Sequence, residues 1–148
     1  MNKNYTYEIL DIKQYYRKKH DERFKITTPI DIYEFIKEDV AHCTREKLII
    51  LGLDSSNSVL FSYVSSIGTV NSAMVHPRNI FQPLLLNNAT SFIMIHQHPS
   101  GNLKASDEDM NVTHRMLEAS NIIGIQLLDH VIVTDEGYFS FREGDLFG

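Results

Sequence analysis

Residues 91–101 read SFIMIHQHPSG, an uncharged apolar run followed by two histidines, a proline and a glycine. The apolar run is typical of a β-strand that is buried on both faces. Because side chains of a strand alternate between its faces, His96 and His98 share one face, with backbones about 6.6 Å apart. Pro99 and Gly101 end the strand, and strand ends are where α/β domains place their sites. We therefore expect a strand that presents two imidazoles at its carboxyl end.

The sequence on either side of this strand alternates between helical and strand patterns. The other predicted elements are a helix that opens at Thr28-Pro29 and ends near His42-Cys43, strands at 47–53 and 59–64, helices at about 80–89 and 106–120, and strands at 126–133 and 138–141. Turn residues at 54–57 make the first two strands a hairpin. This order predicts an α/β fold with a mixed central β-sheet flanked by helices, formed by residues 29–148.

Residues 1–28 are predicted to be a polar lead-in, a strand or short helix that packs against the edge of the domain. This segment is rich in tyrosine and charge, and it contains the basic cluster Arg17-Lys18-Lys19-His20. Because Asp21 and Glu22 follow directly, the cluster is interpreted as solvated surface rather than as a nucleic-acid patch.

The composition is that of an ordinary folded chain with an acidic surplus. Its 148 residues are 43% hydrophobic and 22% charged, which excludes disordered architectures. Fourteen basic residues against nineteen acidic ones argue against nucleic-acid binding as the main task. A single cysteine, Cys43, excludes an internal disulfide framework and a multi-cysteine zinc site. No secretory signal or membrane span is recognised, so the predicted compartment is the cytoplasm.

The two histidines need a third protein ligand, because a catalytic zinc ion takes three and keeps one position for water. Asp109 is the candidate, since Asp107 and Glu108 point to other faces of the predicted helix. Ser106 lies three residues earlier and would place a hydroxyl beside the metal. Ser106 and Asp109 also fit a capping box, which is the favoured interpretation of that pair alone. The combination with His-x-His-Pro is far more specific.

Other enzymes with closely spaced histidines fit this sequence less well. A zinc nucleobase deaminase needs a Pro-Cys-x-x-Cys motif, which a chain with Cys43 alone lacks. The helical His-Glu-x-x-His motif of metalloproteases is absent. A barrel hydrolase needs on the order of 200 residues or more.

The motif His96-Gln97-His98-Pro99-Ser100-Gly101, followed by Ser106 and Asp109, resembles the JAMM (MPN-plus) metalloprotease motif and, more narrowly, the RadC-like JAB domain. The resemblance covers residues 29–141. It includes Gly68-Thr69, Val75-His76-Pro77-Arg78-Asn79-Ile80-Phe81 and Gly124-Ile125-Gln126-Leu127-Leu128-Asp129-His130. The implied fold is JAB/MPN-like, of the cytidine-deaminase-like class.

This resemblance implies a zinc-dependent hydrolase of peptide or isopeptide bonds. Zn²⁺ would be held by His96, His98 and Asp109. Glu46, directly before the first predicted strand, matches the family's proton acceptor, and Ser106 would donate a hydrogen bond to the oxyanion. Gln97 stands where RadC relatives usually carry Asn, and it is expected to face away from the metal and to matter little.

A second hypothesis belongs to another functional class. RadC-like proteins are associated with DNA repair and mobile elements, so the chain could act as an accessory that binds a partner without catalysis. The acidic balance weighs against direct contact with DNA. The partner expected under the first hypothesis is a peptide or protein substrate of unspecified sequence, with no membrane involved. The pair Asp129-His130 is expected to be structural.

Overall fold

The strand that contains His96 and is followed directly by His98, β3 (Ser91–Gln97), lies in the middle of the sheet, and all seven of its residues are buried. The structure is a computed structural model that describes residues 4–41, 43–68 and 75–147. The other elements are α1 (Pro29–Val40), β1 (Lys47–Leu53), β2 (Val59–Ile67), α2 (Pro77–Leu86), α3 (Asp107–Ile123), β4 (Gln126–Val133) and β5 (Tyr138–Ser140). Thr69 of the sequence motif and His42, near which the first helix was expected to end, lie outside the described residues.

The five strands form one mixed sheet in the order β2-β1-β3-β4-β5. β3 and β4 pair in parallel, and the other neighbouring strands pair antiparallel. The parallel pair is connected by α3, as a parallel connection requires a crossover. The predicted hairpin and the mixed central sheet flanked by helices are therefore confirmed.

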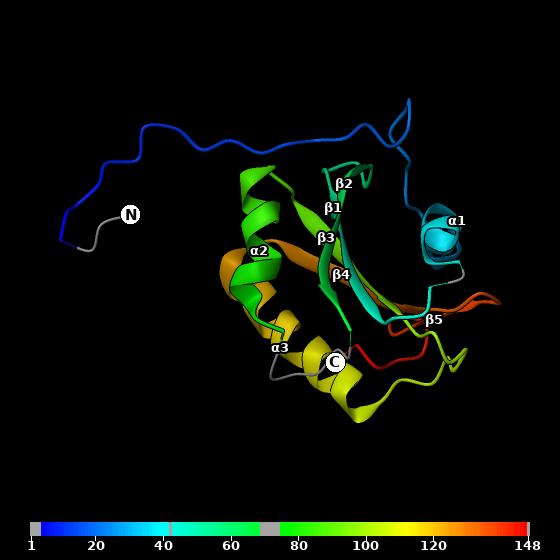
Figure 1. The fold of residues 1–148 in the computed structure, drawn as a ribbon. Helices are drawn as coiled ribbons and strands as arrows, with labels where there is room; N and C mark the ends of the chain where they lie inside the picture. The colour runs from blue at the N-terminus through cyan, green and yellow to red at the C-terminus, as the bar shows by residue number, and fades with distance from the viewer. Residues whose placement is uncertain (1–3, 42, 69–74, 148) are drawn as a thin grey trace.

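Helices cover both faces of the sheet, with α2 and α3 on one side and α1 on the other (Figure 1). Phe92 and Met94 of β3 pack into the cluster shared with α2 and α3, and Ile93 and Ile95 pack into the cluster shared with α1. The alternation continues to the end of the strand. As a result the side chain of His96 points toward α3 and that of Gln97 points toward α1.

β4 carries one more residue than its partner, because Phe92 pairs with Leu127 while the next residue of β3 pairs with Asp129. The extra residue reverses the alternation within the strand. Leu127 packs with the α2 and α3 side, whereas Val131 and Val133 pack with α1. As a consequence His130 faces α3 and the site.

The N-terminal segment differs from the prediction. Its described residues, 4–28, form neither a helix nor a strand, and only an isolated bridge joins Lys25 to Ser58. Large apolar side chains at 5–16 are exposed, because nothing in the described part of the chain covers them. Burial begins at Ile26, close to the predicted boundary at residue 29.

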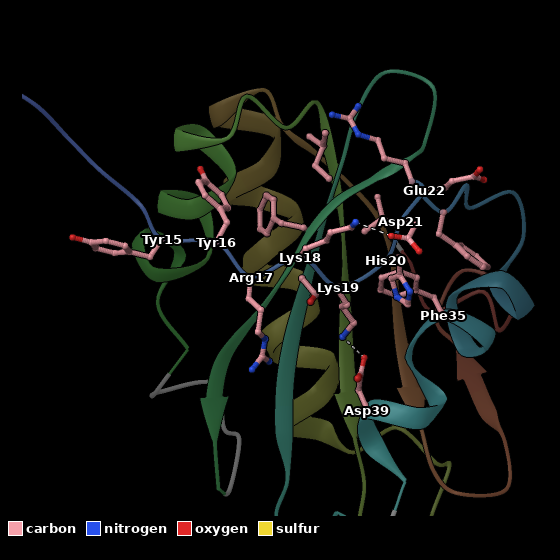
Figure 2. Close-up of a pocket in the computed structure, with 16 residues that line it drawn as sticks. Tyr15, Tyr16, Arg17, Lys18, Lys19, His20, Asp21, Glu22, Phe35 and Asp39 are labelled. Atoms are coloured by element: carbon pink, nitrogen blue, oxygen red, sulfur yellow. Dashed lines mark hydrogen bonds and ion pairs between the residues drawn. The ribbon is translucent and has the colours of Figure 1, made fainter.

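The same segment encloses a cavity of about 910 Å³ against β2 and α1 (Figure 2). Lys18 pairs with Asp21 and Lys19 pairs with Asp39, so two cations of the basic cluster are compensated locally. Neither His96 nor His98 lines this cavity. Among the described residues no helix is both long and apolar enough to cross a membrane.

Gly52 of β1 lies directly opposite Phe61 of β2, and the aromatic ring covers the glycine. A Cβ at Gly52 would stand 2.2 Å from that ring. We expect Gly52→Ala to lower the free energy of unfolding by about 1–3 kcal/mol, since the ring must leave its position. In a Phe61→Val background, Gly52→Ala should lower the free energy of unfolding far less. Urea denaturation of the four proteins of this double-mutant cycle measures the difference.

Gly137→Ala is the matched control, because its Cβ would meet only the side chain of Leu103 at an ordinary 3.6 Å. Equal costs of Gly52→Ala in the two backgrounds would contradict the expected coupling.

Candidate metal centre

Two histidines and an aspartate converge where β3 ends and α3 begins. The rings of His96 and His98 lie 4.5 Å apart between centroids. One possible ligand atom from each of these two residues and from Asp109 lies within 4.8 Å of the others. Asp107 and Glu108 are exposed and lie outside this cluster. The structure thus brings together the three side chains that the sequence analysis selected for a metal.

The hydrogen bonds of the two imidazoles fix their tautomers. Nδ1 of His98 lies 2.6 Å from the carbonyl oxygen of Asn102, which can only accept, so this nitrogen donates. Nδ1 of His96 lies 2.6 Å from Oδ1 of Asp109 and donates to the carboxylate in the same way. Both rings in their neutral form therefore keep a lone pair on Nε2, as a metal ligand must.

Nε2 of His96 is a buried nitrogen without a hydrogen-bond partner among the described residues, and the side chain is only 3% exposed. Burying a polar atom without a partner costs free energy, and a cation would supply the missing interaction. Two imidazoles and one carboxylate form the donor set of a catalytic zinc site with three protein ligands. The described residues therefore fit a divalent metal ion.

Glu46 reaches this cluster from a different strand. Lys47 of β1 pairs with Gln97 of β3, so the residue before β1 lies beside the end of β3 that carries the histidines. Oε2 of Glu46 is 3.5 Å from Nε2 of His96, and the carboxylate side chain is 33% exposed. The strand register thus explains how a residue fifty positions upstream in the sequence joins the cluster.

Ser106 is the N-cap of α3 and forms the predicted capping box with Asp109. Its Oγ accepts a hydrogen bond from the Asp109 amide at 3.1 Å, and Oδ2 of Asp109 accepts one from the Ser106 amide at 2.8 Å. The capping interpretation is therefore confirmed. The same pair of bonds holds the Asp109 carboxylate toward the two imidazoles, so the cap and the cluster are one arrangement.

The carboxylate at the centre of the cluster is ionised. Burial alone would raise the pKa of Asp109, but hydrogen bonds from His96 and His98 and from the Ser106 amide hold it well below its usual value. The hydrogen bond with Asp109 raises the pKa of His98 despite its partial burial, because the protonated ring donates from Nε2 to this carboxylate as well as from Nδ1 to Asn102. Loss of the Nε2 proton leaves the lone pair that a metal ion would take. A negative charge held between two imidazoles favours a bound cation.

A buried Thr–His pair, which no sequence motif indicated, supports the first turn of α3. Oγ1 of Thr113 donates to the carbonyl oxygen of Asp109 at 2.8 Å and lies 2.6 Å from Nδ1 of His130. Burial lowers the pKa of His130 to about 3, so the ring is neutral. Its hydrogen bond fixes Thr113, which in turn fixes the backbone of Asp109.

Asp129 has a structural role, as expected. It accepts hydrogen bonds from the Ser140 hydroxyl at 2.5 Å and from the amides of His130 and Arg142, and it does not reach the metal cluster. The i, i+4 spacing of Asp109 and Thr113 on one helix could have revealed the threonine. The carbonyl of Asn102 leaves no signal in a sequence.

Ser106→Ala should lower the free energy of unfolding by about 0.5–2 kcal/mol, because the amide of Asp109 loses its acceptor. Ser106→Asn retains an acceptor at the N-cap and should restore most of the loss. Thermal or urea unfolding followed by circular dichroism measures both changes. Equal stability of the wild-type protein and the alanine variant would show that the cap does not stabilise α3.

Comparisons with known proteins show the family to which the chain belongs. The model of the RadC-like JAB domain matches residues 26–146. A UPF0758 protein of Bacillus pumilus is 43% identical over 123 residues, which are 83% of this chain and 55% of that protein. A UPF0758 protein of Clostridium botulinum is 41% identical over 131 residues, 88% of this chain and 58% of the relative. The chain spans little more than half the length of these relatives, and it belongs to the RadC-like JAB domain family.

Proposed function

We propose that the chain is a zinc-dependent, metallopeptidase-like hydrolase of peptide or isopeptide bonds that acts in the cytoplasm. The observation that carries this proposal is the buried Nε2 of His96, which has no hydrogen-bond partner among the described residues and lies 3.5 Å from Glu46. A cation at this nitrogen would have a carboxylate base beside it. A metal ion and a carboxylate base are two groups that can together activate water for hydrolysis.

His96, His98 and Asp109 are the residues that would hold the zinc ion, and they supply two nitrogen donors and one oxygen donor. Zinc, when bound, polarises a carbonyl group and lowers the pKa of water to about 7. Asp109 contributes its negative charge to the site, and its hydrogen bonds to the Ser106 amide and to His96 hold its carboxylate in place.

Glu46 carries the proton in this proposal. Its carboxylate takes a proton from the attacking water and delivers it to the nitrogen of the leaving amine, which could not depart as an anion. Oε2 faces Nε2 of His96, and one third of the side chain remains accessible to solvent. The base is therefore close to the metal ligands and open to water and substrate.

Ser106 contributes a hydroxyl at the edge of the same site. Its Oγ accepts from the Asp109 amide, which leaves the hydroxyl proton available to donate. In the proposed reaction this proton is donated to the oxyanion that develops on the substrate carbonyl.

Purified protein should contain about one zinc ion per chain, measured by metal analysis alongside native mass spectrometry. His98→Ala and Asp109→Asn remove one ligand each and should lose most of the metal. His114→Ala is the matched control, because His114 is exposed on α3 and lies outside the cluster. Wild-type protein that binds no divalent metal would refute the site.

Glu46→Gln should retain zinc yet hydrolyse peptides about 10²–10⁴-fold more slowly, since the amide cannot accept the proton. Mass spectrometry of a peptide library incubated with each protein measures this loss. Glu108→Gln, an exposed acidic position on α3, is the control for the change in charge. Zinc-loaded wild-type protein that cleaves no more than Glu46→Gln would instead support the non-catalytic accessory hypothesis.

A further inference from the structure

The side chain of His130 is buried, and one of its ring nitrogens is left unsatisfied by the fold. Nε2 has no hydrogen-bond partner among residues 4–41, 43–68 and 75–147, whereas Nδ1 lies 2.6 Å from Oγ1 of Thr113. A buried polar atom without a partner lowers the stability of the folded state. An apolar ring at this position would avoid that loss, so stability does not explain the histidine.

The hydroxyl of Thr113 connects this ring to the metal cluster. Oγ1 is 2.8 Å from the carbonyl oxygen of Asp109, which can only accept, so the single hydroxyl proton is donated there. For both contacts to be hydrogen bonds, Nδ1 of His130 must then donate to Oγ1. Two hydrogen bonds in series therefore join the sheet to the backbone of a candidate metal ligand.

The ring from which these bonds start is held firmly. It stacks on the buried ring of Phe141, with centroids 4.4 Å apart and planes 17° apart. It also runs nearly parallel to the ring of His96, at 6.2 Å between centroids. Because hydrogen bonds are directional, bonds from a fixed ring set the orientation of the first turn of α3, which apolar contacts alone would leave less defined.

We propose that His130 and Thr113 are positioning residues of the metal site, which hold the carboxylate of Asp109 where a divalent cation needs it, although an apolar pair would give a fold at least as stable. Hydrogen bonds behind a metal ligand typically change metal affinity by about 10–100-fold. The inference rests on the proposed function, because it gives the pair a part in binding the zinc ion of that proposal.

The test compares zinc affinity with the stability of the metal-free protein in the double variant Thr113→Val with His130→Phe. Replacing both partners of a buried hydrogen bond by apolar groups of similar shape can be nearly neutral or stabilising. The variant also keeps an aromatic ring beside Phe141 and His96. We expect the metal-free variant to unfold at a urea concentration no lower than wild type, yet to bind zinc about 10–100-fold more weakly in competition with a chromophoric chelator.

Two further measurements report on geometry rather than on affinity. The visible absorption spectrum of cobalt-loaded protein depends on the arrangement of the ligands, and it should shift in the double variant. In the metal-free protein the amide of Asp109 donates to Ser106. This amide should exchange with deuterium faster in the variant than in wild type, as measured by NMR.

Thr113→Ser retains the hydroxyl and should bind zinc as tightly as wild type. If the double variant does not fold, Thr113→Val against Thr113→Ser makes the same comparison of affinities. The matched control is Ser120→Ala, because Ser120 is a buried residue of the same helix whose hydroxyl donates to the carbonyl oxygen of Leu117, away from the cluster. This control should leave zinc affinity unchanged.

Equal zinc affinity of wild-type protein and the double variant overturns the inference and leaves the proposed function standing. A weaker affinity that comes with a lower urea midpoint of the metal-free variant also overturns it, because the pair would then be merely structural. So does a Thr113→Ser protein that loses as much affinity as Thr113→Val. Wild-type protein that binds no zinc refutes the proposed function and this inference together.

Discussion

The arrangement depends on keeping one ionised carboxylate, that of Asp109, inside the protein. At 2% exposure it would be costly to bury without compensation. The Ser106 amide and the two imidazoles provide that compensation. Each of these groups constrains a different part of the chain, because the amide starts α3 and the histidines end β3. The buried charge therefore joins the helix to the strand, and any metal would bind to a site that folding has already assembled.

Much of the architecture could be predicted because its hydrophobic periodicities are unambiguous. The run before His96 reveals β3, and the turn residues at 54–57 reveal the hairpin of β1 and β2. The reversal within β4 could not be predicted, since the sequence of this strand, QLLDHVIV, does not show where the extra residue lies. That residue nevertheless decides that His130 faces α3. The N-terminal segment was expected to be a polar lead-in with a strand or short helix, and its described residues form neither.

The candidate site was predictable to the extent that its residues are neighbours in sequence. The period of a strand brings His96 and His98 together, and the period of a helix selects Asp109 over its acidic neighbours. Glu46 was predicted only from the family resemblance. Its position beside the cluster is explained by the strand register, in which Lys47 pairs with Gln97. Gln97 itself was expected to matter little because it faces away from the metal. The structure places Gln97 in the lining of a cavity formed by three distant segments, which no local pattern reveals.

The spacing of the candidate ligands along the chain has a consequence for the order in which the site folds. All three candidate metal ligands lie within the segment 96–109, whereas Glu46 stands fifty residues before the first of them. Closing a short loop costs less entropy than closing a long one. A nascent chain can therefore gather the ligands before β1 has docked beside β3. Under the proposed function, the assembly of the ligands and the arrival of the base are then separate steps of folding, and a chain in which β1 has not docked would lack its proton acceptor.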